Sequence, residues 1–223
     1  TLQDLDLDDR QRHRYLDLMH EQTQSMRRLV ADLLTLSSLE SDERPPVETR
    51  FAIAPMLDAL ASDARALSAG AHTVAIDAVD AAEIVGNREE LASAFANLVS
   101  NAIRYTPPGG RVTLAFRVDA DGSGVFSVAD TGIGIAPEHI PRLTERFYRV
   151  DRSRSRATGG TGLGLAIVKH ILLRHRASLD VTSTPGIGST FAVRLPASRV
   201  APGVDAAPPA EPGTRQPAPA RAP

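Results

Sequence analysis

The sequence has no cysteine and no tryptophan, and Lys169 is its one lysine among many arginines. Without cysteine, the chain has no disulfide bond, zinc–thiolate site or cysteine nucleophile. No apolar run approaches the roughly 18–20 residues that a membrane-spanning helix needs. The formal net charge of −2 gives no reason to expect nucleic acid or an anionic membrane as a partner. We therefore expect a soluble domain that is compatible with a reducing, cytosolic compartment.

The hydrophobic content of 42% in 223 residues is enough to bury the core of one domain with additional segments. Composition divides the chain into a helical region at 1–44, a mixed region at 45–197 and a tail at 198–223. The tail is rich in alanine, proline and glycine and has almost no large apolar residues. Burial cannot offset the entropy of ordering such a segment, so we expect the tail to be disordered.

The first region predicts one long helix over residues 9–40, ended by the two prolines that follow at 45 and 46. Its stripe residues recur at alternating spacings of three and four: Leu16, Met19, Thr23, Met26, Val30 and Leu33. This heptad stripe is typical of a coiled coil or a four-helix bundle. A single helix cannot bury it, so we expect a partner helix from a second copy or from sequence upstream. The opening "TLQDLDLDD" resembles a helix end running into a loop, which favours a missing upstream helix.

The mixed region contains apolar residues at the spacing of strands, every second residue, and at the spacing of helices, every three or four residues. The expected strands are 51–53, 72–76, 83–85, 111–118, 124–130, 178–183 and 190–195, and the expected helices are 55–67, 88–105 and 163–176, with a short helix near 138–147. Asn87 can cap the helix at 88–105, and "DADGSG" and "TPGIG" predict hairpin turns. Strand runs interleaved with helices and antiparallel hairpins predict an α+β two-layer sandwich.

The stretch "GGTGLGLAIVKH" at 159–170 places four glycines directly before an apolar helix. A glycine-rich loop that opens a helix presents backbone N–H groups and the positive helix end to an anion such as phosphate. A tight loop that needs positive φ angles would explain the glycines equally well. The stretch matches neither the P-loop pattern, because no Lys-Ser/Thr pair follows, nor the dinucleotide-binding fingerprint.

Asp130 closes the expected strand in "SVADTGIGIAP", where Phe126 and Val128 share its face by period two. A carboxylate on a partly apolar face must find hydrogen-bond donors or shift its pKa. The exocyclic amine of a purine is one such donor. The alternative is that Asp130 caps its own turn, which continues through Gly132 and Gly134.

Two further stretches carry polar groups at helical or loop positions. In "NLVSNAIRYTP", Asn97 and Asn101 are four residues apart on one helix face, and Arg104 and Tyr105 follow one turn later. These groups could hold a metal-bound triphosphate, or they could be a solvated face. In "RLTERFYRVDRSRSRATGG", the arginines could bind phosphate or be a solvated loop, and two aromatic residues at 147–148 could anchor that segment.

Together and in this order, the stretches resemble the catalytic, ATP-binding domain of sensor histidine kinases. "NLVSNAIRYTP" resembles the N box, "DTGIGI" the G1 box, "ERFYRVD" the F box and "GGTGLGLAIVKH" the G2 box. The resemblance covers roughly residues 12–197 and is strongest to sensor kinases of the phosphate regulon. It implies the two-layer sandwich of the HSP90, gyrase and histidine-kinase ATPases, preceded by one helix of a dimerisation four-helix bundle.

The resemblance also implies roles for the matching residues. Asp130 would accept a hydrogen bond from the adenine amine, and Thr190 would lie near the adenine. Asn101 would ligate Mg²⁺ beside Asn97. The residues that would approach the phosphates or close over them are Arg104, Tyr105 and Arg149, with Gly160, Thr161, Gly162, Leu163 and Gly164 as lid hinge and helix start. The family usually has lysine at the position of Arg104, so we expect the contact of this residue with the phosphates to differ from that of the family.

One departure concerns the phosphoacceptor, which in the family is a histidine followed by an acidic residue and then usually Arg-Thr-Pro. None of the six histidines has that context, although His20 is followed by glutamate. We therefore expect the acceptor helix to lie upstream, with this chain carrying the donor half of the reaction.

The resemblance implies a homodimer through the helical bundle, a response-regulator receiver domain as partner and a parent protein anchored in the inner membrane. Two alternatives remain open: a water-activating ATPase of the same fold, and a non-catalytic dimerisation scaffold. The ATPase relatives use a glutamate where Asn97 stands, and an amide cannot act as a base.

Overall fold

The computed structural model describes residues 8–41, 46–150 and 160–203. The helices are α1 (Asp9–Ser41), α2 (Ile53–Ser68), α3 (Arg88–Tyr105) and α5 (Gly164–Arg174), with 3₁₀ turns η1 (Pro137–Arg142) and η2 (Ala197–Arg199). The strands are β1 (Thr49–Ala52), β2 (Thr73–Val79), β3 (Ala82–Gly86), β4 (Arg111–Val118), β5 (Gly124–Asp130), β6 (Ser178–Thr184), β7 (Gly188–Leu195) and β8 (Val200–Pro202). No helix in these ranges is long and apolar enough to cross a membrane.

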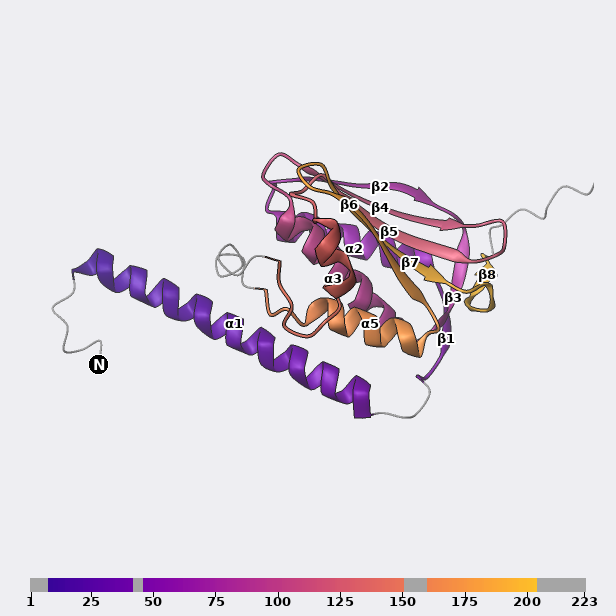
Figure 1. Cartoon of the computed structure of the whole chain (residues 1–223), viewed down its shortest axis with the longest axis horizontal. Helices are drawn as coiled ribbons and strands as arrows, with labels where there is room; N and C mark the ends of the chain where they lie inside the picture. The colour runs from indigo at the N-terminus through magenta and orange to yellow at the C-terminus, as the bar shows by residue number, and fades with distance from the viewer. Residues whose placement is uncertain (1–7, 42–45, 151–159, 204–223) are drawn as a thin grey trace, which may run out of the picture.

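The main sheet has five strands in the order β2-β4-β5-β7-β6. Strand β2 runs parallel to β4, and the other neighbours are antiparallel. Helices α2, α3 and α5 lie together on one side of this sheet (Figure 1). The expected α+β two-layer sandwich is confirmed, and the hairpins β4–β5 and β6–β7 form as predicted.

Helix α3 has the bounds that the sequence predicts, and local signals fix its start. The Asn87 side chain accepts a hydrogen bond from the Glu90 N–H at 3.0 Å, which satisfies one of the free donors of the first turn. Glu89 and Glu90 place negative charge at the positive helix end. Residues at helical spacing, Leu91, Phe95 and Leu98, are fully or almost fully buried against the sheet.

A second, three-stranded antiparallel sheet joins β1, β3 and β8. Its last strand corrects the prediction that the chain is disordered from residue 198. Ala82 to Ile84 pair with 200–202, and Arg199 donates hydrogen bonds to the Val85 carbonyl and to Glu48. These long-range bonds order residues whose composition alone predicts no structure. The rest of the expected tail lies outside the described residues.

Helix α1 is a single long helix whose C-terminal half lies beside α5, while its N-terminal half projects away from the sandwich (Figure 1). Leu36 is buried at 3% exposure in the domain core, and Leu29 and Leu39 pack against that core. The apolar members of the heptad stripe face elsewhere and are 42–66% exposed. The helix thus has two apolar faces, one docked on the domain and one open to a partner.

Candidate nucleotide site

The site begins at Asp130, the last residue of β5. Its Oδ1 accepts a hydrogen bond from the Gly132 N–H at 2.8 Å, so the carboxylate caps its own turn. Burial raises the pKa of Asp130, and the N–H groups of Gly132 and Ser189 oppose this rise. A carboxylate can accept more hydrogen bonds than this one, and a partly buried carboxylate is stabilised by each further donor. The exocyclic amine of a purine would be such a donor.

The glycines after Asp130 allow the chain to pass close beneath the end of α3. A Cβ on Gly132 would lie 2.5 Å from the Tyr105 carbonyl oxygen. Gly134 has φ +67°, and a Cβ there would lie 2.0 Å from the Thr184 carbonyl oxygen. The Ile133 N–H donates to the Tyr105 carbonyl at 3.2 Å. The G1 loop is therefore pinned between α3 and β6, which brings Tyr105 to Asp130.

Helix α3 presents its polar residues toward the start of α5. The Asn97 amide donates to the Ser93 carbonyl at 3.0 Å. Its Oδ1 lies 2.7 Å from where a Cβ on Gly164 would be, so only glycine fits at the first residue of α5 without displacing Asn97. Asn101 is partly buried one turn further along α3. The structure thus places Asn97 against the G2 helix start, with Asn101 one turn further along the same helix.

The G2 loop reaches two arginines before α5 begins. A Cβ on Gly160 would lie 3.1 Å from Arg104 Nη1 and 3.9 Å from Arg149 Nη2. The Leu163 N–H donates to the Thr161 hydroxyl at 3.2 Å, and Leu163 itself is fully buried. The loop therefore sets two guanidinium groups beside the N-terminus of a helix, an arrangement suited to phosphate.

Electrostatics support an anion-binding role for Arg104. Burial lowers its pKa, and the positive charges of Arg28 and Arg149 lower it further, while Tyr105 and Asp32 oppose the decrease. Arginine nevertheless remains protonated near neutral pH. Like charges held together in a half-buried place produce a positive potential that an anion relieves.

The F box is fixed by contacts between its tyrosine and η1. The Tyr148 hydroxyl lies 2.8 Å from His139 Nδ1, and the Arg142 guanidinium lies 4.3 Å from the centre of the Tyr148 ring. The Phe147 N–H donates to the Gly162 carbonyl at 2.9 Å. Tyr148 is thus an anchor, as expected, whereas the Phe147 side chain is 58% exposed. These contacts hold the segment that carries Arg149 against the G2 loop.

The structure does not bring Thr190 to the face of the sheet that carries Asp130. In the β5–β7 register, Asp130 lies opposite Ser189, and Thr190 lies opposite Ala129. Opposed residues share a face and successive residues alternate, so Thr190 lies on the other face of the sheet. Ser189 is buried beside Asp130, with its hydroxyl 2.9 Å from that of Ser183. Phe191 and Val193 face the core, and Ser189 shares their face by period two. This alternation in the sequence could have predicted Ser189 rather than Thr190.

A Mg²⁺ ion at this site would need ligands from outside the described side chains. Asn101 offers an amide oxygen, and no group of three or more His, Asp or Glu side chains among the described residues could hold a metal ion by itself. Mg²⁺ commonly takes few protein ligands and completes its shell with substrate phosphates and water. The site therefore suits a metal that arrives with a nucleotide. Residues 151–159, which contain most of the arginine-rich stretch after the F box, lie outside the described residues.

Two residues of α1 reach the site without having been predicted there. Asp32 Oδ2 accepts a hydrogen bond from the Thr161 hydroxyl at 2.6 Å, and the charge of Arg28 acts on Arg104. Both residues lie off the heptad stripe, four residues apart on one face. Leu29 and Leu36, seven residues apart and off the heptad stripe, form a second apolar row on α1, and this row could have predicted that the face docks on the domain.

Comparison with known proteins supports the same assignment. Residues 86–199 match the model of the histidine kinase-, DNA gyrase B- and HSP90-like ATPase family. The phosphate regulon sensor protein PhoR of Pseudomonas aeruginosa is 49% identical over 189 residues, which are 84% of this chain and 42% of PhoR. The sensor-like histidine kinase SenX3 of Mycobacterium tuberculosis is 44% identical over 171 residues, which are 76% of this chain and 41% of SenX3. The chain therefore spans less than half the length of these relatives.

Solved structures agree. The mycobacterial sensor histidine kinase MprB has a TM-score of 0.59 and 27% identity, over 67% of this chain and 97% of that one. Full-length ShkA in complex with AMPPNP has a TM-score of 0.71 and 26% identity, over 87% of this chain and 40% of that one. The chain belongs to the histidine kinase-, DNA gyrase B- and HSP90-like ATPase family, as a sensor histidine kinase catalytic domain that resembles that of PhoR.

Proposed function

We propose that this site binds ATP with Mg²⁺ and donates the γ-phosphoryl group to a histidine. One observation carries the proposal: a desolvated carboxylate, Asp130, lies at one end of the site, and two guanidinium groups flank Gly160 at the other. A purine amine suits the first end and a triphosphate suits the second. Asn101 would ligate Mg²⁺, and Ser189, which lies beside Asp130, would take the role near the adenine that was expected for Thr190.

In the proposed transfer, the bond between the γ-phosphorus and the bridging oxygen breaks, and that oxygen departs with ADP. The phosphorus bonds to an imidazole nitrogen of the acceptor, and the proton that the ring loses passes to a base outside this chain or to water. Such transfers depend mainly on positioning and on stabilising charge. Arg149 and Arg104 would stabilise that charge, and the start of α5 would hold the phosphates. The acceptor is proposed to be a histidine outside this chain, because none of its six histidines has the acceptor context.

The same proposal extends to the partners. The exposed heptad stripe of α1 supports a homodimer through a helical bundle. The relatives are named as sensor kinases, which supports a response-regulator receiver domain as the next phosphoryl acceptor and a membrane-anchored parent. The identity to PhoR supports a role in phosphate sensing.

A water-activating ATPase has no support here. Its general base would stand where Asn97 does, and the Asn97 amide is a hydrogen-bond donor to Ser93 rather than a base. The scaffold alternative gains no support either, because the polar groups around Gly160 and Gly164 are in place.

Calorimetry tests the binding part of the proposal. The chain is expected to bind Mg-ATP and Mg-ADP, and Asp130→Asn is expected to lose most of that affinity while remaining folded by circular dichroism. Transfer is then tested with γ-labelled ATP and a separate helical domain of a related sensor kinase that carries the acceptor histidine. An acid-labile, alkali-stable phosphoryl label on that domain would support transfer. A folded chain that binds no nucleotide would refute the proposed function.

A further inference from the structure

Helix α1 brings a carboxylate to the phosphate end of the site. Asp32 Oδ2 lies 2.6 Å from the Thr161 hydroxyl, which donates to it. The same hydroxyl oxygen accepts from the Leu163 N–H at 3.2 Å, directly before α5. An anion is thus bonded to the G2 loop at the helix N-terminus, where a phosphate oxygen would be expected.

The cations around Asp32 are those that the proposed function assigns to phosphate. Arg104 and Arg149 flank Gly160, the residue before Thr161. Arg28 lies one turn before Asp32 on α1, and its charge acts on Arg104 together with that of Asp32. Asp32 therefore offsets part of the positive charge that a triphosphate would otherwise meet.

The docking of α1 holds Asp32 in this place. Leu36 is buried in the domain core one turn after Asp32. Further along, Glu40 pairs with Arg146 of the F box and with His170 Nε2 of α5, the latter at 3.1 Å. Apolar and ionic contacts on one face of α1 thus fix the carboxylate against the G2 loop.

We propose that Asp32 is an internal anion that competes with the terminal phosphate of ATP for Thr161 and the surrounding arginines. Binding of ATP then requires Asp32 to withdraw, which weakens the docking of α1 on α5. The inference rests on the proposed function and names a regulation of that same site. It predicts that removal of the Asp32 charge tightens ATP binding, whereas a carboxylate that merely positions Thr161 for ATP would have the opposite effect.

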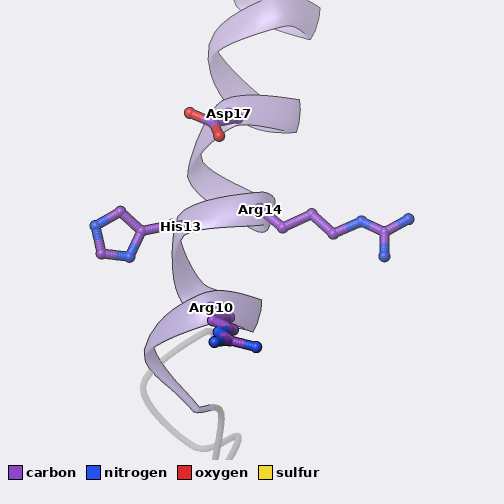
Figure 2. A pocket seen from close by; sticks show the side chains of 4 residues that line it. All are labelled: Arg10, His13, Arg14 and Asp17. Atoms are coloured by element: carbon purple, nitrogen blue, oxygen red, sulfur yellow. The ribbon is translucent and has the colours of Figure 1, made fainter.

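Titration calorimetry on the full chain shows whether removal of the Asp32 charge tightens or weakens ATP binding. Asp32→Asn keeps an acceptor for Thr161 and removes the charge. We expect it to lower the Kd for Mg-ATP about fivefold or more, a typical size for coupling between sites, with a smaller change for Mg-ADP. Asp17→Asn is the matched control. Asp17 is exposed on the projecting half of α1, beside Arg10, His13 and Arg14 (Figure 2), and its removal is expected to leave both affinities unchanged.

Hydrogen exchange gives an independent measure, because coupling between ATP and α1 docking must be reciprocal. Saturating Mg-ATP is expected to speed amide exchange around Leu36 in the wild-type chain, more than Mg-ADP does. Unchanged or weaker ATP binding by folded Asp32→Asn, with a wild type that binds normally, would overturn the inference alone. Loss of ATP binding by the wild type itself would overturn the proposed function and this inference with it.

Discussion

The ring of Phe95 on α3 stacks on the ring of Phe126 on β5, with centroids 4.0 Å apart and planes inclined by 20°. Both rings are almost fully buried. Asn97 follows Phe95 by two residues on α3, and Asp130 follows Phe126 by four at the end of β5, so the ring pair joins the two elements that carry these groups. Core packing and site geometry are therefore linked at one contact.

Phe126→Ala is expected to destabilise the domain by about 3–5 kcal/mol, because a large buried ring leaves a cavity that the structure fills only in part. Urea unfolding followed by circular dichroism measures this change. Ile187→Ala, at a side chain that is 70% exposed, is the control and should change stability by less than about 0.5 kcal/mol. Equal effects of the two substitutions would contradict the burial argument.

Asp130→Asn is expected to weaken Mg-ATP binding about 10- to 100-fold, since a hydrogen bond to a charged group contributes about 1.5–3 kcal/mol.

The same substitution is expected to increase the free energy of unfolding near neutral pH. Burial raises the pKa of Asp130 above its ordinary 3.8, so the native state holds more protons than the unfolded state between these two values. Wild-type stability therefore falls as pH rises through that window, and the variant lacks this decrease. Chemical unfolding at pH 3 to 7 tests the sign; a variant less stable than wild type at pH 7 would contradict it.

Arg104→Gln is expected to weaken Mg-ATP binding about tenfold and to reduce its dependence on salt, because one guanidinium no longer meets the phosphates. Removing a positive charge from beside Arg28 and Arg149 should leave the fold at least as stable. Arg117→Gln removes an exposed arginine that pairs with Asp77 on the sheet, and it should leave affinity unchanged. Calorimetry at two salt concentrations measures both variants. A salt dependence unchanged by Arg104→Gln would exclude a phosphate contact.

His175 predicts a pH-dependent loss of stability on the acid side. It is fully buried, its Nε2 accepts from the Asn87 N–H at 3.0 Å, and its Nδ1 lies 2.8 Å from the Ile171 carbonyl. Burial lowers the pKa of His175 below 6.5, while the Ile171 carbonyl, Glu90 and Glu48 oppose that effect and Arg199 adds to it.

With the folded pKa below the unfolded one, the neutral ring contributes fully above about pH 6.5, and stability falls as pH decreases toward the folded pKa. His175→Gln, which cannot titrate, should lose stability at pH 8 but show a shallower decrease from pH 6.5 to 5. Unfolding curves across this range test the difference in slope. Parallel curves for the two proteins would show that His175 does not titrate in this way.

Gly162→Ala is expected to lower the free energy of unfolding by more than Gly186→Ala does. Gly162 has φ +74°, and a Cβ there would lie 2.9 Å from the Phe147 Cα, which is backbone and cannot move aside easily. Gly186 has φ +77° with nothing within 4 Å of the added Cβ. Gly186→Ala should therefore cost about 1 kcal/mol from backbone strain, and Gly162→Ala should cost more and also weaken Mg-ATP binding. Thermal unfolding and calorimetry compare the pair, and equal losses would rule out the contact with Phe147.

Local patterns predicted the elements and most of the site because their signals lie within a few residues. The Asn87 cap fixed the start of α3, and the apolar spacing indicated that the helix continues to its last turn. The hairpins at β4–β5 and β6–β7 followed from alternation and turn residues. The sequence also singled out Asp130, Asn97, Asn101 and the G2 glycines as candidates, through the resemblance that joins them.

Contacts between distant segments were decided by the tertiary structure. The parallel pairing of β2 with β4 and the pairing of β8 with β3 depend on where whole elements pack, which no local pattern contains. The β5–β7 register placed Ser189 beside Asp130 and turned Thr190 to the other face. A change of one residue in such a register exchanges the two faces of a strand.

The sequence by itself determined the family, the sandwich and the chemical groups of the site, because periodicity, caps and glycine positions act locally. Tertiary structure decided what α1 does beyond offering a heptad stripe. Burial of Leu36 in the core turned a second face of this helix toward α5, and that rotation brought Asp32 to Thr161. A contact across 129 positions of chain depends on packing between whole elements, which the sequence near either residue does not specify.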